Sequence, residues 1–304
     1  LFFTFKVSIK DWKNSGILER EIKYYENINK KHNCSYTFFT YGDLEDKQIL
    51  NSLNTDINII TLFKKKKLNN SFLVFFYSLY YVIKNHKKLK KFEFLKSNQN
   101  YGSWILILLK WINKSKIISR CGYDLFHFSI LKKNPIKIII SYFICLFIYK
   151  NSNIILSPSD FYKNFISKFF FIDKKMIKVL PNFVDTNIFF PNDGISKYKK
   201  RILFIGRLEK QKNIFSILKS ISNSDYQLDI LGTGSLKLKI IKFAIKNNCN
   251  IHFIAEKYSN NEIPQLLNKY KFFILFSLYE GNPKVLLEAM SCGLCAITSN
   301  TYGI

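Results

Sequence analysis

Short apolar runs alternate with longer amphipathic segments along the chain, which is typical of a parallel β-sheet whose strands are joined by helices. The apolar runs predict strands, and segments with apolar residues three and four positions apart predict helices. The strands expected in the first half are residues 1–8, 36–40, 58–62, 92–95, 116–120 and 153–157. The helices expected there are residues 17–31, 72–87, 104–113 and 136–150, with a loop containing Gly16 after the first strand.

A cluster of Pro, Asn, Asp and Gly interrupts this alternation at residues 181–194 and marks a linker. A second series follows, with strands at 201–205, 227–231, 250–253, 272–276 and 295–298 and helices at 212–222, 235–247 and 261–270. We therefore expect an α/β protein of two tandem Rossmann-like, doubly wound domains, residues 1–186 and 187–304. Doubly wound sheets bind ligands at the carboxyl ends of their strands, so we expect a site in a cleft that both domains face.

The two ends of the chain indicate a piece of a longer protein, because it starts at Leu1 rather than Met and stops at Ile304 directly after a glycine. The second domain is therefore expected to be incomplete. The longest apolar run, residues 136–148, is shorter than the ~20 residues that a helix needs to cross a bilayer. No transmembrane span is predicted.

The net charge of +26 points first to nucleic acid. However, only four of the 47 basic residues are arginines, at positions 20, 120, 201 and 207, and the bidentate fork of arginine is the usual reader of phosphates and base edges. No nucleic-acid partner is predicted. The dispersed lysines indicate a solvated surface, with peripheral contact to an anionic membrane as their more plausible use. Six scattered cysteines fit reduced thiols, so we expect a cytoplasmic protein at the inner face of the membrane.

Two carboxylates, Glu280 and Glu288, lie on either side of an expected helix start. Asn282 is a suitable N-cap, and Pro283 suits the first helical position because its missing N–H would be unpaired there. Glu280 would then lie beside the free amides of the first turn, with Glu288 inside the helix. An anionic, hydroxyl-rich ligand would meet amides and carboxylates together. A nucleotide sugar fits this description.

A second phosphate-binding candidate follows the first strand of the second series. Gly206 lets the backbone approach a ligand, and Arg207 and Lys212 supply positive charges across a strand-to-helix turn. This arrangement fits a diphosphate clamp, with two exposed surface cations as the alternative. Gly232-Thr233-Gly234 also follows a strand, but Lys237 takes the place of the third glycine of a dinucleotide fingerprint. A plain turn is therefore favoured there over a phosphate cradle.

The first domain offers weaker candidates. Gly16 lies where such folds bring backbone to the cleft, and Arg120 closes a strand, either reaching the cleft or pairing with a carboxylate such as Asp124. No Asp-x-Asp sequence or histidine cluster is present, so no metal site is predicted. Cys292 and Cys295 follow a helix and have no partner pair, which argues against a zinc or redox site.

In order and spacing, these motifs resemble the family 4 retaining glycosyltransferases. Residues 201–208 with Lys212 are similar to the donor-site opening of that family, and residues 280–290 to its Glu-x7-Glu element. Residues 181–191 resemble its interdomain segment, and residues 120–124 a motif in a subset of members. The resemblance spans nearly the whole chain and is strongest over residues 200–304.

The resemblance implies a GT-B architecture, with the nucleotide-sugar donor on the second domain and the acceptor on the first. It implies that Arg207 and Lys212 hold the donor diphosphate, that Glu280 contacts the transferred sugar, and that Glu288 contacts the ribose. The reaction would be metal-independent transfer with retention, without a cofactor, and Glu280 would orient a cation-like transition state. The candidate donor-binding positions are Gly16, Arg120, Gly206, Gly232, Gly281, Asn282, Pro283, Lys284, Leu287 and Glu288.

The sequence departs from the family in two places. Many members carry a first-domain histidine near the reacting centre, whereas here Arg120 occupies the nearest motif and His127 lies seven residues further on, so that role is unassigned. Residues 282–284 replace a glycine-rich version, which leaves the donor sugar open. The predicted function is a retaining glycosyltransferase acting on a glycan or lipid-linked acceptor in cell-surface polysaccharide or lipopolysaccharide biosynthesis. The alternatives are another GT-B enzyme, such as a nucleotide-sugar epimerase, and a non-enzymatic basic protein that binds nucleic acid or membrane.

Overall fold

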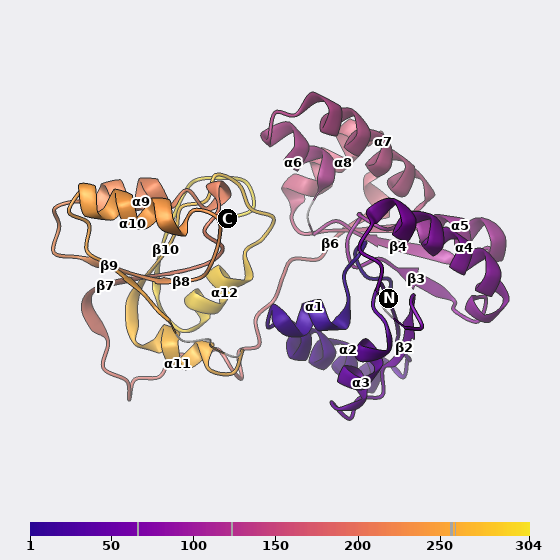
Figure 1. Ribbon diagram of the computed structural model, residues 1–304, viewed down its shortest axis with the longest axis horizontal. Helices are drawn as coiled ribbons and strands as arrows, with labels where there is room; N and C mark the ends of the chain where they lie inside the picture. Colours follow the sequence, from indigo (N-terminus) through magenta and orange to yellow (C-terminus); the bar gives the residue numbers. More distant parts are fainter. Residues whose placement is uncertain (66, 123, 256–257, 259) are drawn as a thin grey trace. The chain divides into compact units, whose positions relative to one another are not determined.

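The computed structural model describes residues 1–65, 67–122, 124–255, 258 and 260–304 (Figure 1). The chain divides into two compact units, Leu1–Leu180 and Pro181–Ile304. The division falls slightly before the expected boundary at 186/187. Leu180 still donates its backbone N–H to the carbonyl of Ser157 at 2.7 Å, which keeps it with the first sheet.

The first unit contains a parallel sheet. Its strands are β1 (Thr37–Thr40), β2 (Asn58–Thr61), β3 (Phe94–Lys96), β4 (Lys116–Arg120), β5 (Ile154–Ser157) and β6 (Ile177–Val179). β1 pairs with β2, and the others are paired in the order β3-β4-β5-β6. Phe2 joins the two groups, because it forms parallel bridges to Phe39 and to Ser97. The resulting spatial order, β2-β1-Phe2-β3-β4-β5-β6, is that of a Rossmann-like sheet.

The strand expected at residues 1–8 is wrong in extent. Only the stretch around Phe2 pairs with neighbouring strands, and a turn follows in which Val7 N–H donates to the carbonyl of Thr4. Ser8 then caps helix α1 (Ile9–Asn14). The apolar run has the composition of a strand because Phe3 and Phe5 are buried, but Phe5 fills the core from the turn. A helix, not a strand, therefore precedes Gly16.

Helices connect the strands of the first unit. They are α1, α2 (Leu18–His32), α3 (Leu44–Asn51), α4 (Ser71–Leu89), α5 (Trp104–Asn113), α6 (Leu125–Leu131), α7 (Pro135–Asn151) and α8 (Asp160–Phe170), with a 3₁₀ turn, η1 (Lys174–Met176), before β6. Helices α1, α3, α6 and α8 and strand β6 were not predicted from the sequence. Each of these helices begins at a side-chain cap, Ser8, Asp43, Asp124 and Ser159 respectively, which is the start signal that apolar periodicity alone overlooks.

The second unit is a five-stranded parallel sheet with the order β11-β10-β7-β8-β9. The strands are β7 (Tyr198–Ile205), β8 (Gln227–Leu231), β9 (Ile251–Phe253), β10 (Tyr270–Leu275) and β11 (Cys295–Thr298). The helical segments are η2 (Lys210–Lys212), α9 (Ile214–Ile221), α10 (Lys237–Lys246), α11 (Ile263–Asn268) and α12 (Lys284–Ser291). The chain runs outward from β7 through β8 to β9, then returns to the other side of β7 as β10. The switch point of the sheet therefore lies between β7 and β10.

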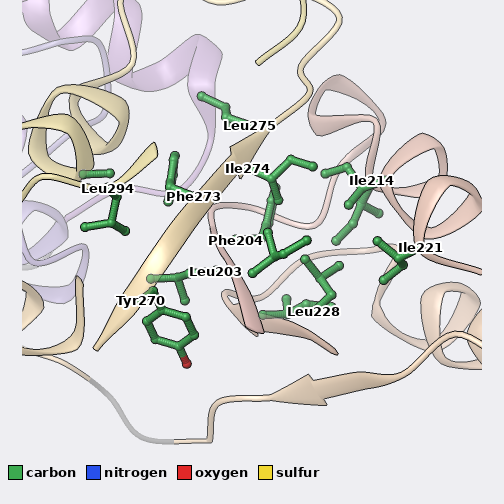
Figure 2. Close-up of a cluster of buried hydrophobic side chains, with 14 of the residues drawn as sticks. Leu203, Phe204, Ile214, Ile221, Leu228, Tyr270, Phe273, Ile274, Leu275 and Leu294 are labelled. Carbon is green, nitrogen blue, oxygen red and sulfur yellow. The ribbon is translucent and has the colours of Figure 1, made fainter. Parts of the chain in front are cut away.

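The strands of the second unit are anchored by a hydrophobic core of their own (Figure 2). Leu203, Phe204 and Phe273 are fully buried in the adjacent strands β7 and β10. Leu228 packs beside them from β8, and Ile214 from α9. This core fixes where the strands end, and so fixes the loops that follow them.

Candidate functional site

The loops after β7 and β10 are joined at the switch point. Leu278 N–H donates to the carbonyl of Gln211 at 2.8 Å, and Gln211 Nε2 donates to the carbonyl of Tyr279 at 2.9 Å. Two segments far apart in sequence therefore form one surface at the carboxyl edge of the sheet, where open α/β sheets bind ligands. Gln211 was not among the predicted site residues, because its hydrogen bonds to residues 278 and 279 form only once the strands are paired.

The central feature of this surface is an ion pair between Lys212 and Glu280. Lys212 Nζ lies 2.5 Å from Glu280 Oε1, and the two side chains are only 12% and 9% exposed. A buried pair of this kind contributes little net stability, but removing one partner leaves a buried charge that is uncompensated. The two residues that were predicted to hold the diphosphate and the sugar thus contact each other.

Close backbone packing accounts for the glycine of the next loop. A Cβ at Gly232 would lie 1.9 Å from the carbonyl oxygen of Gly206, and Gly206 N–H donates to the carbonyl of Leu231 at 3.0 Å. Leu208 N–H donates to Thr233 O in the same way, at 2.8 Å. The loop after β8 is therefore held against the loop after β7, beside the Lys212–Glu280 pair.

Arg207, by contrast, is exposed. Its charge contributes to lowering the pKa of Glu209, after the larger effect of the hydrogen bonds that Glu209 accepts from the backbone and hydroxyl of Ser235. Arg207 thus lies on the outer side of the loop in which Lys212 is nearly buried.

The start of α12 differs from the prediction. Pro283 is the N-cap, with φ −74° and ψ 112°, and α12 begins at Lys284, so Asn282 does not cap the helix. Asn282 lies one residue too early, because the extended backbone of Pro283 intervenes. Its carbonyl accepts a hydrogen bond from Asn182 Nδ2 at 2.5 Å, whereas its Oδ1 is a buried atom without a hydrogen-bond partner among the residues described.

Both carboxylates of the motif are buried. Glu280 is 7% exposed and Glu288, inside α12, is 8% exposed, while Leu287 between them is half-buried. The backbone of Glu280 is enclosed from the other side, since its N–H donates to Tyr302 O at 3.3 Å and a Cβ at Gly303 would lie 2.2 Å from its carbonyl oxygen. The segment after β11 thus completes the wall around Glu280.

The first-unit candidates lie in different surroundings. Arg120, at the end of β4, is close enough to Lys96 for their positive charges to repel each other. Lys96 Nζ donates to the hydroxyl of Tyr25 on α2 at 3.1 Å. Burial first, and then the Arg120 charge, lowers the pKa of Lys96 to about 8. Asp124 is engaged by the His127 backbone at 2.8 Å and by the Tyr149 hydroxyl at 2.6 Å. Gly16 ends the turn after α1 with φ +70°, and Tyr123 lies outside the described residues.

His127 is enclosed rather than presented on a surface. It is 7% exposed, its Nδ1 lies 3.0 Å from the Tyr162 hydroxyl, and its ring packs against those of Phe161 and Phe165. Burial lowers its pKa. Burial of the ring therefore disfavours the charged form of the imidazole, against the opposing charge of Asp124.

Within the described residues, no three His, Cys, Asp or Glu side chains gather as they would around a metal ion. No helix in the part of the chain that the structure describes is both long and apolar enough to span a membrane.

Residues 185–304 match the family model described as glycosyl transferases group 1. Over 282 residues the chain is 23% identical to an uncharacterized glycosyltransferase of Methanocaldococcus jannaschii, covering 92% of this chain and 74% of that protein. It is 31% identical over 159 residues to the Escherichia coli UDP-Gal:alpha-D-GlcNAc-diphosphoundecaprenol alpha-1,3-galactosyltransferase, covering 46% of this chain and 41% of that one. The chain thus spans less than half the length of this second relative.

Solved structures share the fold over the whole chain. The apo form of the lipopolysaccharide outer core galactosyltransferase WaaB aligns with a TM-score of 0.68 at 22% identity, covering 99% of this chain and 80% of that one. Anabaena HepE in complex with UDP and glucose aligns with a TM-score of 0.72 at 12% identity, covering 99% and 81%. The GT-B type α/β fold, with two Rossmann-like units, is confirmed.

Proposed function

We propose that the chain is the donor- and acceptor-binding part of a retaining glycosyltransferase that uses a nucleotide-diphosphate sugar. The buried Lys212–Glu280 pair at the switch point carries this proposal, because it joins a cation and a carboxylate where α/β sheets bind nucleotides. The group 1 match over residues 185–304 covers the same segment.

The donor would replace the ion pair with ligand contacts. The diphosphate takes Lys212 as its partner, with Arg207 approaching from its exposed position. Glu280, released from Lys212, accepts hydrogen bonds from the hydroxyls of the transferred sugar. The backbone N–H groups of Gly281, Asn282 and Lys284, at the start of α12, would lie beside the same group, and Glu288 from within α12 would bind the ribose.

In the proposed reaction, positive charge develops on the transferred sugar and negative charge on the leaving diphosphate. The bond between the anomeric carbon and the diphosphate oxygen breaks, and the oxygen of an acceptor hydroxyl bonds to the same face of the sugar while its proton passes to the leaving diphosphate oxygen. Glu280 stabilises the positive charge that develops on the sugar, while Lys212, Arg207 and the helix amides stabilise the leaving diphosphate. We propose that this site needs no metal ion or other cofactor.

The acceptor class is proposed from the relatives. The E. coli relative is named for transfer to a diphosphoundecaprenol-linked sugar, and a Campylobacter jejuni relative, 26% identical over 174 residues, is named for a diphospho-undecaprenol acceptor. We propose a lipid-linked glycan as acceptor and a place in cell-surface polysaccharide or lipopolysaccharide assembly.

A thermal-shift screen with UDP-, GDP- and ADP-sugars tests the donor site. One nucleotide sugar should raise the melting temperature, with or without EDTA, and Arg207→Ala and Glu288→Ala should abolish the shift because each removes a donor contact. Lys239→Ala, an exposed lysine of α10, is the control and should leave the shift unchanged. If no nucleotide sugar stabilises the protein, the proposal is wrong.

A further inference from the structure

Three helices of the first unit form one layer. α5 contacts both α4 and α7 (Figure 1). Their carboxyl-terminal ends are tied together: Asn113 Nδ2 donates to the carbonyl of His86 at 3.0 Å, and Trp111 Nε1 donates to Asn151 Oδ1 at 3.2 Å. The three helices therefore lie side by side and are joined at these ends.

The outward side of this layer is apolar. Helices of a globular protein normally present polar residues on the side away from the core, yet here large apolar side chains between 40% and 70% exposed follow helical spacing. We call them the helical face: Phe72, Leu73, Phe76, Tyr80 and Ile83 on α4, Trp111 and Ile112 on α5, and Ile136, Ile139, Ile140, Phe143 and Phe147 on α7.

A second set of residues on the same helices is buried in the core of the first unit. The exposed residues of the helical face are therefore additional to the residues that pack these helices. On α4, Val74 and Val82 are fully buried, as are Cys145 and Ile148 on α7. α4 and α7 are thus apolar on two opposite sides. An exposed apolar area of this extent marks an interaction surface.

The charged residues of the three helices have one sign. The three helices contain no Asp or Glu, and their charged residues are Lys84, Lys87, Lys88, Lys110, Lys137 and Lys150. Such a rim repels a second copy of a chain that carries a net charge of +26, and it attracts anionic headgroups. Lysine stems also lie along apolar surface while the ammonium reaches the polar layer.

We propose that the helical face docks on an anionic lipid bilayer. The apolar side chains enter the boundary between headgroups and acyl chains, and the lysines contact the headgroups, as with helices that lie in the plane of a membrane. A hollow on α7 is suited to an acyl chain beside an ammonium group. It is lined by Phe143, Ile144, Leu146, Phe147, Lys150 and Asn151. Docking requires neither donor nor acceptor, so it is tested independently of the proposed function.

Co-sedimentation with vesicles tests the apolar part. The protein should bind vesicles of phosphatidylcholine and phosphatidylglycerol, and Ile140→Gln/Phe143→Gln should weaken partitioning about tenfold or more, because two side chains no longer transfer from water. The matched control is Leu238→Gln/Ile245→Gln on α10, whose side chains are 73% and 75% exposed in the second unit. Equal binding by both double variants would overturn the proposal.

Charge reversal tests the basic rim. Lys87→Glu/Lys88→Glu should bind these vesicles several-fold more weakly than Lys239→Glu/Lys242→Glu, an equal change of net charge on exposed α10 positions. Binding should fall with added salt and with removal of phosphatidylglycerol. Equal losses in the two charge variants would mean attraction by net charge alone and would contradict a defined face.

The fluorescence of Trp111 reports how deeply the helical face enters the bilayer. Trp111 is 61% exposed, whereas Trp12 is 3% exposed and Trp104 is half-buried, with its ring against Phe5 and Phe75. Lipids brominated on the acyl chain should quench the wild type and quench Trp111→Phe much less, while both proteins still sediment with vesicles. Absence of quenching in the wild type, or a dimer in sedimentation velocity that Ile140→Gln/Phe143→Gln dissociates, would assign the helical face to another occupant.

Discussion

At the scale of single residues, the contact between Lys212 and Glu280 connects the structure to the chemistry. Sequence spacing identified both residues but not their pairing, because 68 positions separate them and only the sheet order brings them together. The pairing places a carboxylate on the cation that we propose binds the diphosphate.

Glu280→Gln separates the two roles proposed for this pair. The variant should bind the free nucleoside diphosphate at least as tightly as the wild type, because Lys212 no longer has a competing carboxylate. Turnover should fall about 100-fold or more, because charge stabilisation of the transition state is lost. Calorimetry with the nucleotide and a transfer assay check the two parts. Loss of nucleotide binding with unchanged turnover would reverse the assignment.

At the scale of elements, the parallel strands and the longer helices were predictable, and the helix starts were less so. α5 and β4 lie where apolar periodicity predicts them, because each combines a clear pattern with a polar boundary. The start of α12 was predicted one residue early, since Asn282 has a favoured N-cap side chain, whereas Pro283, which takes the cap position, has no side chain that can cap. Residues 1–8 were misread because buried aromatics in a turn have the composition of a strand.

The cap of α6 yields a stability prediction at this scale. Asp124 is fully buried and accepts from the His127 backbone and the Tyr149 hydroxyl. Asp124→Ala should lower the free energy of unfolding by about 2–4 kcal/mol, the sum of a lost cap and a buried hydroxyl without its acceptor.

Asp173→Ala is the matched control for this cap. Asp173 caps the short 3₁₀ turn η1 by accepting from Lys175 N–H at 2.8 Å, and its loss should cost about 1 kcal/mol. Urea denaturation of the two variants beside the wild type makes the comparison. Similar losses in both would show that the buried network around Asp124 adds nothing beyond capping.

At the scale of the whole molecule, two Rossmann-like units carry different surfaces. The second unit gathers its candidate residues at the switch point of its sheet, and the first unit presents an apolar, lysine-rimmed layer of helices. Two units were predictable from the local pattern of strands and helices, and the candidate donor residues were identified from motifs and stay a prediction. The helical face was not predicted, since an apolar helix in sequence looks the same whether one side or both sides are buried.

The central claim is that the loops after β7 and β10 bind the diphosphate of a sugar donor. Calorimetric titration of the nucleoside diphosphate into the wild type, Lys212→Ala and Lys210→Ala tests it most directly, because both lysines belong to η2 and Lys210 is exposed. We expect Lys212→Ala to weaken binding about tenfold or more, through loss of a charge-assisted hydrogen bond, and Lys210→Ala to leave binding nearly unchanged. Equal affinities for Lys212→Ala and Lys210→Ala, or no binding by the wild type, would contradict the account.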